Sequence, residues 1–369
     1  MIKICGRIIC VMLTCTGVIS VAQSINDNTS VKISSSEKDK QDMREHIAQN
    51  MLLYQRDVGG WPKHVNDVKV DYTKVLSPGQ AAGVKDDNSR NDATIDNGAT
   101  VKEIRFLAEQ YKTSGNKTYL TAAEKGISFL LKAQYANGGW PQFYPDTSNY
   151  RKQITFNDNA MINVLSLLQD VSQGVNQMDV IGKSFVKPAT LAVENGIDCI
   201  LKTQVRVKGT PTVWCAQHDK NTLLPTKARS YELVSLSGME SAGILDFLMR
   251  QKNPSEKIKT AVIAGVNWLK KVQLKGYKYE NIPDATTPKG YDKFLQPDPN
   301  QSVWARFYEV ETNEPFVCGR DGIMKKDLKD IEYERRTGYA WYGTWPKQML
   351  ETNYPAWASR YLKNSVSAK

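Results

Sequence analysis

The sequence is poor in the residues that zinc sites and nucleotide sites need. It has only three histidines, His46, His64 and His218, and their spacing matches no zinc-binding motif. It also lacks a phosphate-binding P-loop, a dinucleotide fingerprint and a basic-aromatic RNA signature. We therefore expect neither a zinc enzyme nor a nucleic-acid partner, and for His218 the lining of a cleft and a structural hydrogen bond stay equal alternatives.

Long hydrophobic runs are also scarce, and the clearest one lies at the N-terminus. Residues 1–22 combine a basic start, an apolar stretch and a small-residue cleavage site. This pattern predicts a cleaved secretory signal, since it is too short for a membrane-spanning helix. We expect a secreted or periplasmic protein with no membrane attachment after cleavage. At most one disulfide can then form, because three cysteines remain: Cys199, Cys215 and Cys318.

The remaining composition is that of a folded protein with a basic surface. The chain has 369 residues, 41% of them hydrophobic and 24% charged, with a net charge of +10. Residues 23–39 are polar and predict a flexible leader, and residues 40–369 predict a single domain, which we expect to be a monomer. The positive charge by itself favours an anionic partner, which could be an acidic polysaccharide, a nucleic acid or a membrane surface, although a solvated lysine-rich surface would give the same balance.

An internal repeat is the strongest pattern in the chain. Gln55, Gln134, Gln204 and Gln273 each end a helix-like run, at spacings of roughly 70 residues, with further amphipathic segments between them. The segment 238–250 is apolar nearly all round, which predicts an inner helix. These features predict a mainly α fold, an incomplete α/α toroid of about three helix pairs. Long irregular loops and a short β-containing segment would form its substrate cleft.

Two equivalent loops of the repeat carry carboxylates. Asp96 and Asp158 each precede a predicted inner helix and are followed by asparagine, and the third such loop carries Arg229. Either aspartate alone could be an ordinary helix N-cap. Two aspartates at equivalent positions, beside an arginine-bearing loop, favour a site at one end of the molecule.

After Gln273 the regularity stops. Residues 277–334 form a proline- and aspartate-containing stretch with one strand-like alternation around Arg306. Gly-flanked Arg320 and then Arg335 follow in or beyond it. Arginines in such loops favour carboxylate or phosphate recognition, because the planar guanidinium binds an anion with two parallel hydrogen bonds.

The ordered motifs resemble one enzyme family. The chain contains GGWPK, TIDNGAT, GGWPQFYP, ITFNDNAM, WCAQHD, ARSYELVSLSG, FVCGRDG and RRTGYAWY. Together they resemble the family 10 polysaccharide lyases, which are pectate lyases, over residues 43–347. The resemblance implies a toroid-like fold and calcium-dependent cleavage of α-1,4-polygalacturonate by anti β-elimination.

By motif position the resemblance also implies roles for single residues. Asp96 and Asp158 match calcium ligands, and Arg320 matches the proposed general base. Galacturonate carboxylates would be bound by Arg229, Arg306 and Arg335, for which exposed salt bridges are the alternative. A free arginine has a pKa above about 12, so a basic role needs Ca²⁺ and other cations nearby to lower it. In the alternative, Arg320 stays charged and stabilises the enolate-like intermediate.

Three rival functions remain open at this stage. An inverting glycoside hydrolase would use Asp96 and Asp158 as acid and base, without Ca²⁺ or an arginine cluster. The Gln and Trp repeats are also similar to those of terpenoid cyclases, but the segment Asp86-Asp87-Asn88 matches their initiation motif poorly. A noncatalytic polygalacturonate-binding protein could use the same charged residues.

Overall fold

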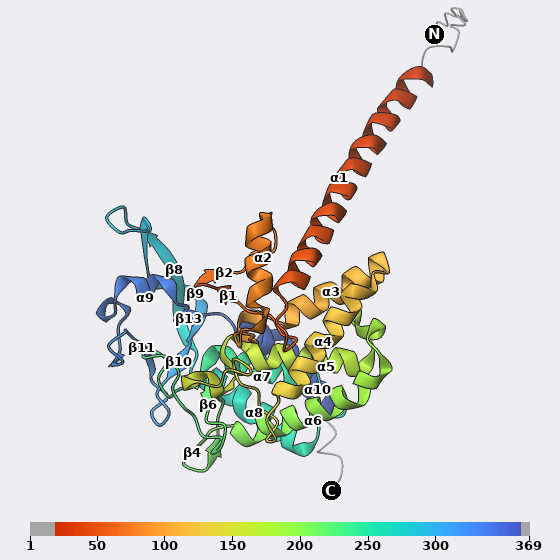
Figure 1. Ribbon diagram of the computed structural model, residues 1–369. Helices are drawn as coiled ribbons and strands as arrows, with labels where there is room; N and C mark the ends of the chain where they lie inside the picture. Colours follow the sequence, from red (N-terminus) through yellow and green to blue (C-terminus); the bar gives the residue numbers. More distant parts are fainter. Residues whose placement is uncertain (1–18, 363–369) are drawn as a thin grey trace, which may run out of the picture.

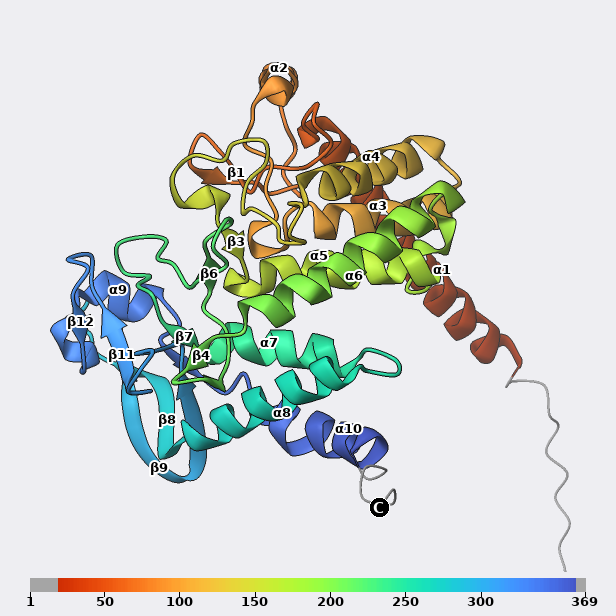
Figure 2. The same cartoon turned by 90° about the horizontal axis from the view of Figure 1, so that it is seen from below.

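Three consecutive helix hairpins form the centre of the structure (Figures 1 and 2). The computed structural model describes residues 19–362, with side chains from residue 37 onward. Its α-helices are α1 (Ile19–Tyr54), α2 (Pro78–Asp86), α3 (Val101–Ser114), α4 (Lys117–Ala133), α5 (Ala160–Gln173), α6 (Val186–Thr203), α7 (Gly238–Met249), α8 (Glu256–Lys271), α9 (Tyr333–Gly338) and α10 (Tyr354–Tyr361).

The hairpins stack in two layers. Helices α3, α5 and α7 contact one another in sequence, and the end of α1 with α4, α6 and α8 forms the second layer. Helix α7 lies in the interior, as its apolar sequence predicts, with nine of its twelve residues buried. Helix α3 ends at Gly115, whose φ of 71° is the left-handed conformation that glycine adopts without strain.

The repeated glutamines and tryptophans tie the second layer together. Gln55 donates to the carbonyl oxygen of Ala122 in α4 at 2.9 Å, and Gln134 donates to that of Ala192 in α6 at 2.9 Å. Gln204 makes the same bond to α8. In each repeat the indole N–H of a buried tryptophan also donates to a carbonyl near the end of the preceding helix. The repeat is therefore a device for joining one hairpin to the next.

Short antiparallel strands surround the helices. They are β1 (His64–Val65), β2 (Val68–Lys69), β3 (Ile154–Thr155), β4 (Arg206–Val207), β5 (Thr210–Pro211), β6 (Gln217–His218), β7 (Leu236–Ser237), β8 (Leu274–Pro283), β9 (Tyr291–Ala305), β10 (Phe307–Tyr308), β11 (Pro315–Cys318), β12 (Met324–Lys325) and β13 (Tyr342–Gly343). The long ribbon β8–β9 pairs with β13, and a second sheet has the order β12-β11-β10-β7. In Figure 1 the ribbon and α9 lie on the opposite side of the molecule from α3 and α4.

The prediction of an incomplete α/α toroid is wrong. About half of the described chain is helical, and several small antiparallel sheets make up much of the rest. The largest departure is the segment after Gln273, which was expected to be irregular and instead forms β8 and β9. A helical period reports only on contacts within a helix, whereas these strands form a hairpin held by cross-strand pairing, from Pro283 with Tyr291 to Leu274 with Val303.

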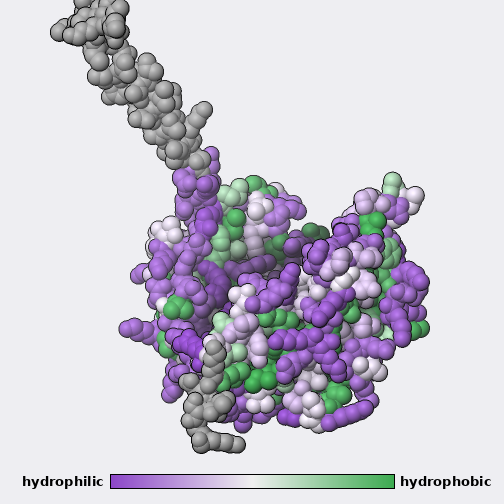
Figure 3. Space-filling model, turned by 180° about the vertical axis from the view of Figure 1, so that it is seen from behind, coloured by the Kyte–Doolittle hydropathy of each residue, from purple (hydrophilic) through white to green (hydrophobic). Residues whose placement is uncertain are grey.

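The predicted N-terminal signal lies largely outside the described residues. The structure begins at Ile19 with α1, which includes the segment 23–39, and side chains are described only from residue 37. The division into a signal, a leader and one domain stays a prediction. Among the described helices, none is both long enough and apolar enough to cross a membrane. The face shown in Figure 3 is mostly hydrophilic, with hydrophobic residues in small groups.

Candidate active site

The two aspartate-bearing loops meet at one end of the helix layers. Asp96 begins the 3₁₀ turn η2 (Asp96–Gly98) before α3, and Asp158 lies within the turn η4 (Asn157–Asn159) before α5. The two turns contact each other, and η4 also contacts α7. Asn97 and Asp158 have φ values of 49° and 50°, a left-handed conformation that is uncommon outside glycine and is often found at functional sites.

Neither aspartate caps a helix. The N-cap residues of α3 and α5 are Thr100 and Asn159, and neither makes a side-chain capping bond. The side chain of Thr100 instead accepts from Trp61 N and donates to Thr94 O, which fixes the loop from inside. The capping alternative is therefore wrong for these two positions, so their carboxylates are available to bind groups outside the helices.

Asp96 pairs with a lysine from the first Gly-Gly-Trp-Pro loop. Its Oδ2 atom lies 2.7 Å from Lys63 Nζ, and its backbone N–H donates to Thr94 Oγ1. Asp96 is 7% exposed, and its Oδ1 atom is buried without a hydrogen-bond partner among the described residues. A buried carboxylate oxygen without a donor is costly unless something else binds it. This atom is thus a candidate ligand for a cation.

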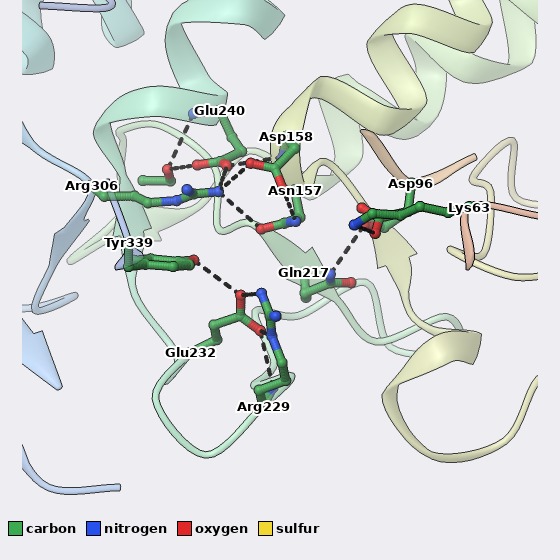
Figure 4. A network of polar contacts seen from close by, with 12 residues as sticks. Lys63, Asp96, Asn157, Asp158, Gln217, Arg229, Glu232, Glu240, Arg306 and Tyr339 are labelled. Atoms are coloured by element: carbon green, nitrogen blue, oxygen red, sulfur yellow. Dashed lines mark hydrogen bonds and ion pairs between the residues drawn. The ribbon is translucent and has the colours of Figure 1, made fainter. Parts of the chain in front are cut away.

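Asp158 belongs to a buried charge network (Figure 4). Arg306 Nη2 donates to Asp158 Oδ1 at 2.8 Å, to Glu240 Oε1 at 2.7 Å and to Asn157 Oδ1 at 3.1 Å. Asn157 also donates to the other oxygen of Asp158, and the backbone N–H of Asp158 donates to Glu240. The residues of this network come from η4, from α7 and from the position just after β9, so the network fixes the orientation of Asp158.

Arg306 is the buried centre of this network. Burial acts to lower its pKa, but the charges of Glu240, Tyr339 and Asp158 outweigh that effect and raise the pKa above its ordinary value. Arg306 is 3% exposed, and its Cζ atom lies 4.6 Å from the ring centroid of Tyr339. Arg306 is therefore a permanently charged partner of Asp158.

Tyr339 connects the network to the next arginine. Its hydroxyl donates to Glu232 Oε1 at 3.0 Å, and Glu232 accepts two side-chain bonds from Arg229. Burial raises the pKa of Glu232, but the bonds and charge of Arg229 lower it by more, so the carboxylate is ionised. Figure 4 shows Arg229 and Arg306 on the two sides of the Tyr339 and Glu232 link.

The remaining two predicted arginines share one carboxylate. Arg335 Nε donates to Glu334 Oε2 at 2.7 Å, and Arg320 Nε donates to Glu334 Oε1. These bonds, that of Arg335 first, lower the pKa of Glu334 to about 2. Arg229 and Arg335 both lie against the ring of Tyr231, at 4.9 and 4.6 Å. All six residues that the sequence predicts thus belong to two connected clusters, one at η2 and Lys63 and one that runs from Asp158 to Arg320.

Arg320 is the most exposed member of the site. Its side chain is 61% exposed, and the bond to Glu334 raises its pKa. Its backbone N–H donates to Glu332, which holds the turn between β11 and β12 against the start of α9. In this arrangement Arg320 is protonated, so it could act as a base only after it loses a proton, which the bond to Glu334 opposes.

The sequence analysis did not identify the side chains that bond to the predicted site residues. These are Lys63, Glu232, Glu240, Glu334 and Tyr339. Most lie inside the quoted motifs, at the end of GGWPK and in ARSYE and RRTGY, so their proximity to predicted residues was the available signal. Glu240 lies just beyond such a motif and was recognisable only as the third residue of α7.

His218 has a structural role. It is fully buried, its Nε2 accepts from the backbone N–H of Cys215 at 3.1 Å, and its Nδ1 bonds to the carbonyl of Leu223 at 2.9 Å. Burial lowers its pKa to about 4, so the ring is neutral at physiological pH. The structural alternative for His218 is therefore the correct one.

Comparison with known proteins identifies the family. A family model described as pectic acid lyase matches residues 55–350, which include every residue of both clusters. The chain belongs to the pectic acid lyase family. Two solved structures agree with this membership, and both are of the family 10 polysaccharide lyase from Cellvibrio cellulosa. No functionally curated protein matches the sequence.

Both structures are 38% identical to this chain and cover 85% of it. One is a mutant in complex with trigalacturonic acid, with a TM-score of 0.72 and 92% of that chain covered. The other gives a TM-score of 0.71 with 91% covered. The sequence-based resemblance to this family is therefore confirmed over most of the chain.

Proposed function

We propose that this protein is a calcium-dependent pectate lyase that cleaves α-1,4-polygalacturonate by anti β-elimination and releases unsaturated oligogalacturonides. The observation that carries the proposal is the connected arrangement of Asp96, Asp158 and four arginines in a member of the pectic acid lyase family. The oligogalacturonate in the Cellvibrio complex supports the substrate class.

The reaction explains why carboxylates and arginines are needed together. The base must remove the proton on C5, next to the uronate carboxylate, while the C4 oxygen leaves. That proton is weakly acidic until the carboxylate charge is neutralised. When bound, Ca²⁺ supplies this neutralisation, and arginines supply the rest by charge-assisted hydrogen bonds.

The residues present fit a calcium ion that the substrate helps to hold. Ca²⁺ takes six to eight oxygen ligands, and Asp96 and Asp158 offer carboxylate oxygens on two turns in contact. The unpartnered Oδ1 of Asp96 is available for such a bond. Within the described chain no group of three or more His, Cys, Asp or Glu side chains is arranged to hold a metal. We propose that substrate oxygens are among the further ligands.

We assign Arg320 to proton abstraction from C5. Substrate binding must first exchange its bond to Glu334 for contacts with the sugar, because the present bond raises the pKa of Arg320. An alkaline medium and nearby cations, Arg335 and the metal among them, favour the neutral guanidine. The enolate-stabilising role of a charged Arg320 remains the alternative.

Arg229 and Arg335 are the better placed of the other arginines for binding galacturonate carboxylates. The side chain of Arg229 is 43% exposed, and two of its nitrogens donate hydrogen bonds to the carboxylate of Glu232. Arg306 is buried and engaged with Asp158 and Glu240, so we assign it to holding Asp158. Export through the predicted signal, and a monomeric state, would suit an enzyme that meets a polymer outside the cell.

The decisive experiment follows the ultraviolet absorbance of unsaturated products. The purified protein is incubated with polygalacturonate, with and without a chelator, and with heavily methyl-esterified pectin. We expect rising absorbance that the chelator abolishes and that esterified pectin supports poorly. New reducing ends without absorbance would instead indicate a hydrolase, and binding without either signal would indicate a noncatalytic protein.

A further inference from the structure

A charged pocket adjoins the Asp96 cluster. It has a volume of about 430 Å³ and is lined by residues from three loops, among them Lys63, Asp67, Arg90, Asp92 and Arg151. Lys63 is common to the pocket and to the ion pair with Asp96, so the pocket lies next to the Asp96 cluster. The roles assigned above to Arg229, Arg306, Arg320 and Arg335 leave this pocket unexplained.

The walls of the pocket share a backbone layer with the Asp96 turn. Thr94 N donates to Trp61 O at 3.0 Å, and Tyr144 N donates to Ala93 O at 3.1 Å. Phe143, which lines the pocket, forms an isolated β-bridge with Thr94. A sugar bound in the pocket would therefore lie at a fixed position relative to Asp96.

The two arginines of the pocket are more exposed than Lys63, which pairs with Asp96. Arg90 is 45% exposed and bonds to Asp87 at 2.9 Å, and Arg151 is 40% exposed and bonds to Asp146. Exposed pairs of this kind contribute little to stability, so an incoming carboxylate can replace the acidic partner at little cost. By contrast, Asp92 is held by the buried Arg56 through two bonds of 2.6 and 2.9 Å. Asp92 is therefore fixed by bonds to a buried residue, whereas Arg90 and Arg151 can exchange their partners for a ligand carboxylate.

The mixture of charges indicates the chemical class of the ligand. Guanidinium groups bind a carboxylate, whereas the carboxylates of Asp67 and Asp92 would repel a bare anion but accept hydrogen bonds from hydroxyl groups. A uronate sugar has both kinds of group on one ring. We propose that this pocket is a distal subsite that binds a further galacturonate unit of the same chain, through Arg90 and Arg151. This inference rests on the proposed lyase function.

The test compares substrates of different length. Wild type and the Arg90→Gln/Arg151→Gln double variant are assayed on trigalacturonate and hexagalacturonate by product absorbance. We expect the ratio of kcat/KM on the hexamer to that on the trimer to fall about tenfold, as the loss of charge-assisted bonds to one carboxylate would give. Arg206→Gln on β4, which Figures 1 and 2 place away from β1, should leave the ratio unchanged.

Each other outcome has a distinct meaning. An unchanged ratio in an active double variant would overturn the subsite, and so would an equal loss on both lengths, which would assign the loops to holding Asp96. If thermal melting shows the double variant unfolded, the single variant Arg90→Gln decides by the same ratio, since that side chain is exposed. Absence of unsaturated product with wild type on either length would refute the lyase function itself.

Discussion

Replacement of Arg306 separates two roles for this residue, substrate binding and support of Asp158. Arg306→Gln removes the positive charge between Asp158 and Glu240, whose side chains are 26% and 0% exposed. Removing one partner of a buried ion pair typically costs about 3–5 kcal/mol, because the remaining charge is left in a medium that solvates it poorly. We expect the free energy of unfolding at neutral pH to fall by about 3 kcal/mol or more.

The assay is denaturant unfolding followed by circular dichroism, with turnover measured on the same preparations. Arg250→Gln is the matched control, since its side chain is 53% exposed and lies 3.8 Å from Asp246. That variant should lose at most about 1 kcal/mol. Arg306→Gln should also lower kcat more than it raises KM, because Asp158 loses the donor that orients it.

A specific result would refute this reasoning. If Arg306→Gln is as stable as the Arg250→Gln control and its main effect is a large rise in KM, then Arg306 contacts substrate, as the motif position implied. The network of Asp158, Glu240 and Asn157 would in that case have to rearrange when substrate binds.

Three further predictions use the same protein. Asp96→Asn should raise the calcium concentration for half-maximal activity by roughly tenfold or more, and an unchanged calcium dependence would remove Asp96 from the metal site. Arg320→Ala should lower turnover roughly a thousandfold. Arg320→Lys should keep a trace of activity, with its pH profile shifted downward. If both variants lose only a fewfold in turnover and bind substrate more weakly, Arg320 binds a substrate carboxylate and is not the base. The pKa of His218 is lowered from 6.5 to about 4, so this histidine takes up a proton at a higher pH in the unfolded protein than in the folded one. The free energy of unfolding should therefore fall by about 3 kcal/mol from pH 7 to pH 4. Denaturant titrations should show a flatter pH dependence for His218→Gln, and identical slopes would contradict this assignment.

The parts of the fold that the sequence predicts well are those with local causes. Amphipathic spacing between the repeated glutamines predicts helices such as α3, and the apolar sequence of 238–250 predicts the buried α7. The repeated Gln and Trp were visible as spacing, and the structure explains them as bonds between successive helices. Each of these features depends on residues close in sequence or on a repeated pattern.

The parts that were missed depend on strand pairing or on partners far away in the sequence. The ribbon β8–β9 contains prolines and acidic residues that indicate loops in isolation, yet its strands pair from Leu274 with Val303 to Pro283 with Tyr291. The exposed outer parts of such a ribbon carry little hydrophobic signal. The toroid prediction was wrong because several small antiparallel sheets make up much of the described chain outside the helices, and the helical repeat carried no signal for them.

Arg306 shows how the same limit affects the site. An arginine in an irregular segment is expected to be exposed, and its motif position suggested contact with substrate. Its burial depends on Glu240, 66 residues away, and on Asp158, 148 residues away. Two carboxylates, from η4 and α7, together offset the desolvation of one guanidinium. Sequence reasoning can therefore place such a residue in the active site, but the distinction between a residue that binds substrate and one that orients another side chain needs the partners that only the fold brings together.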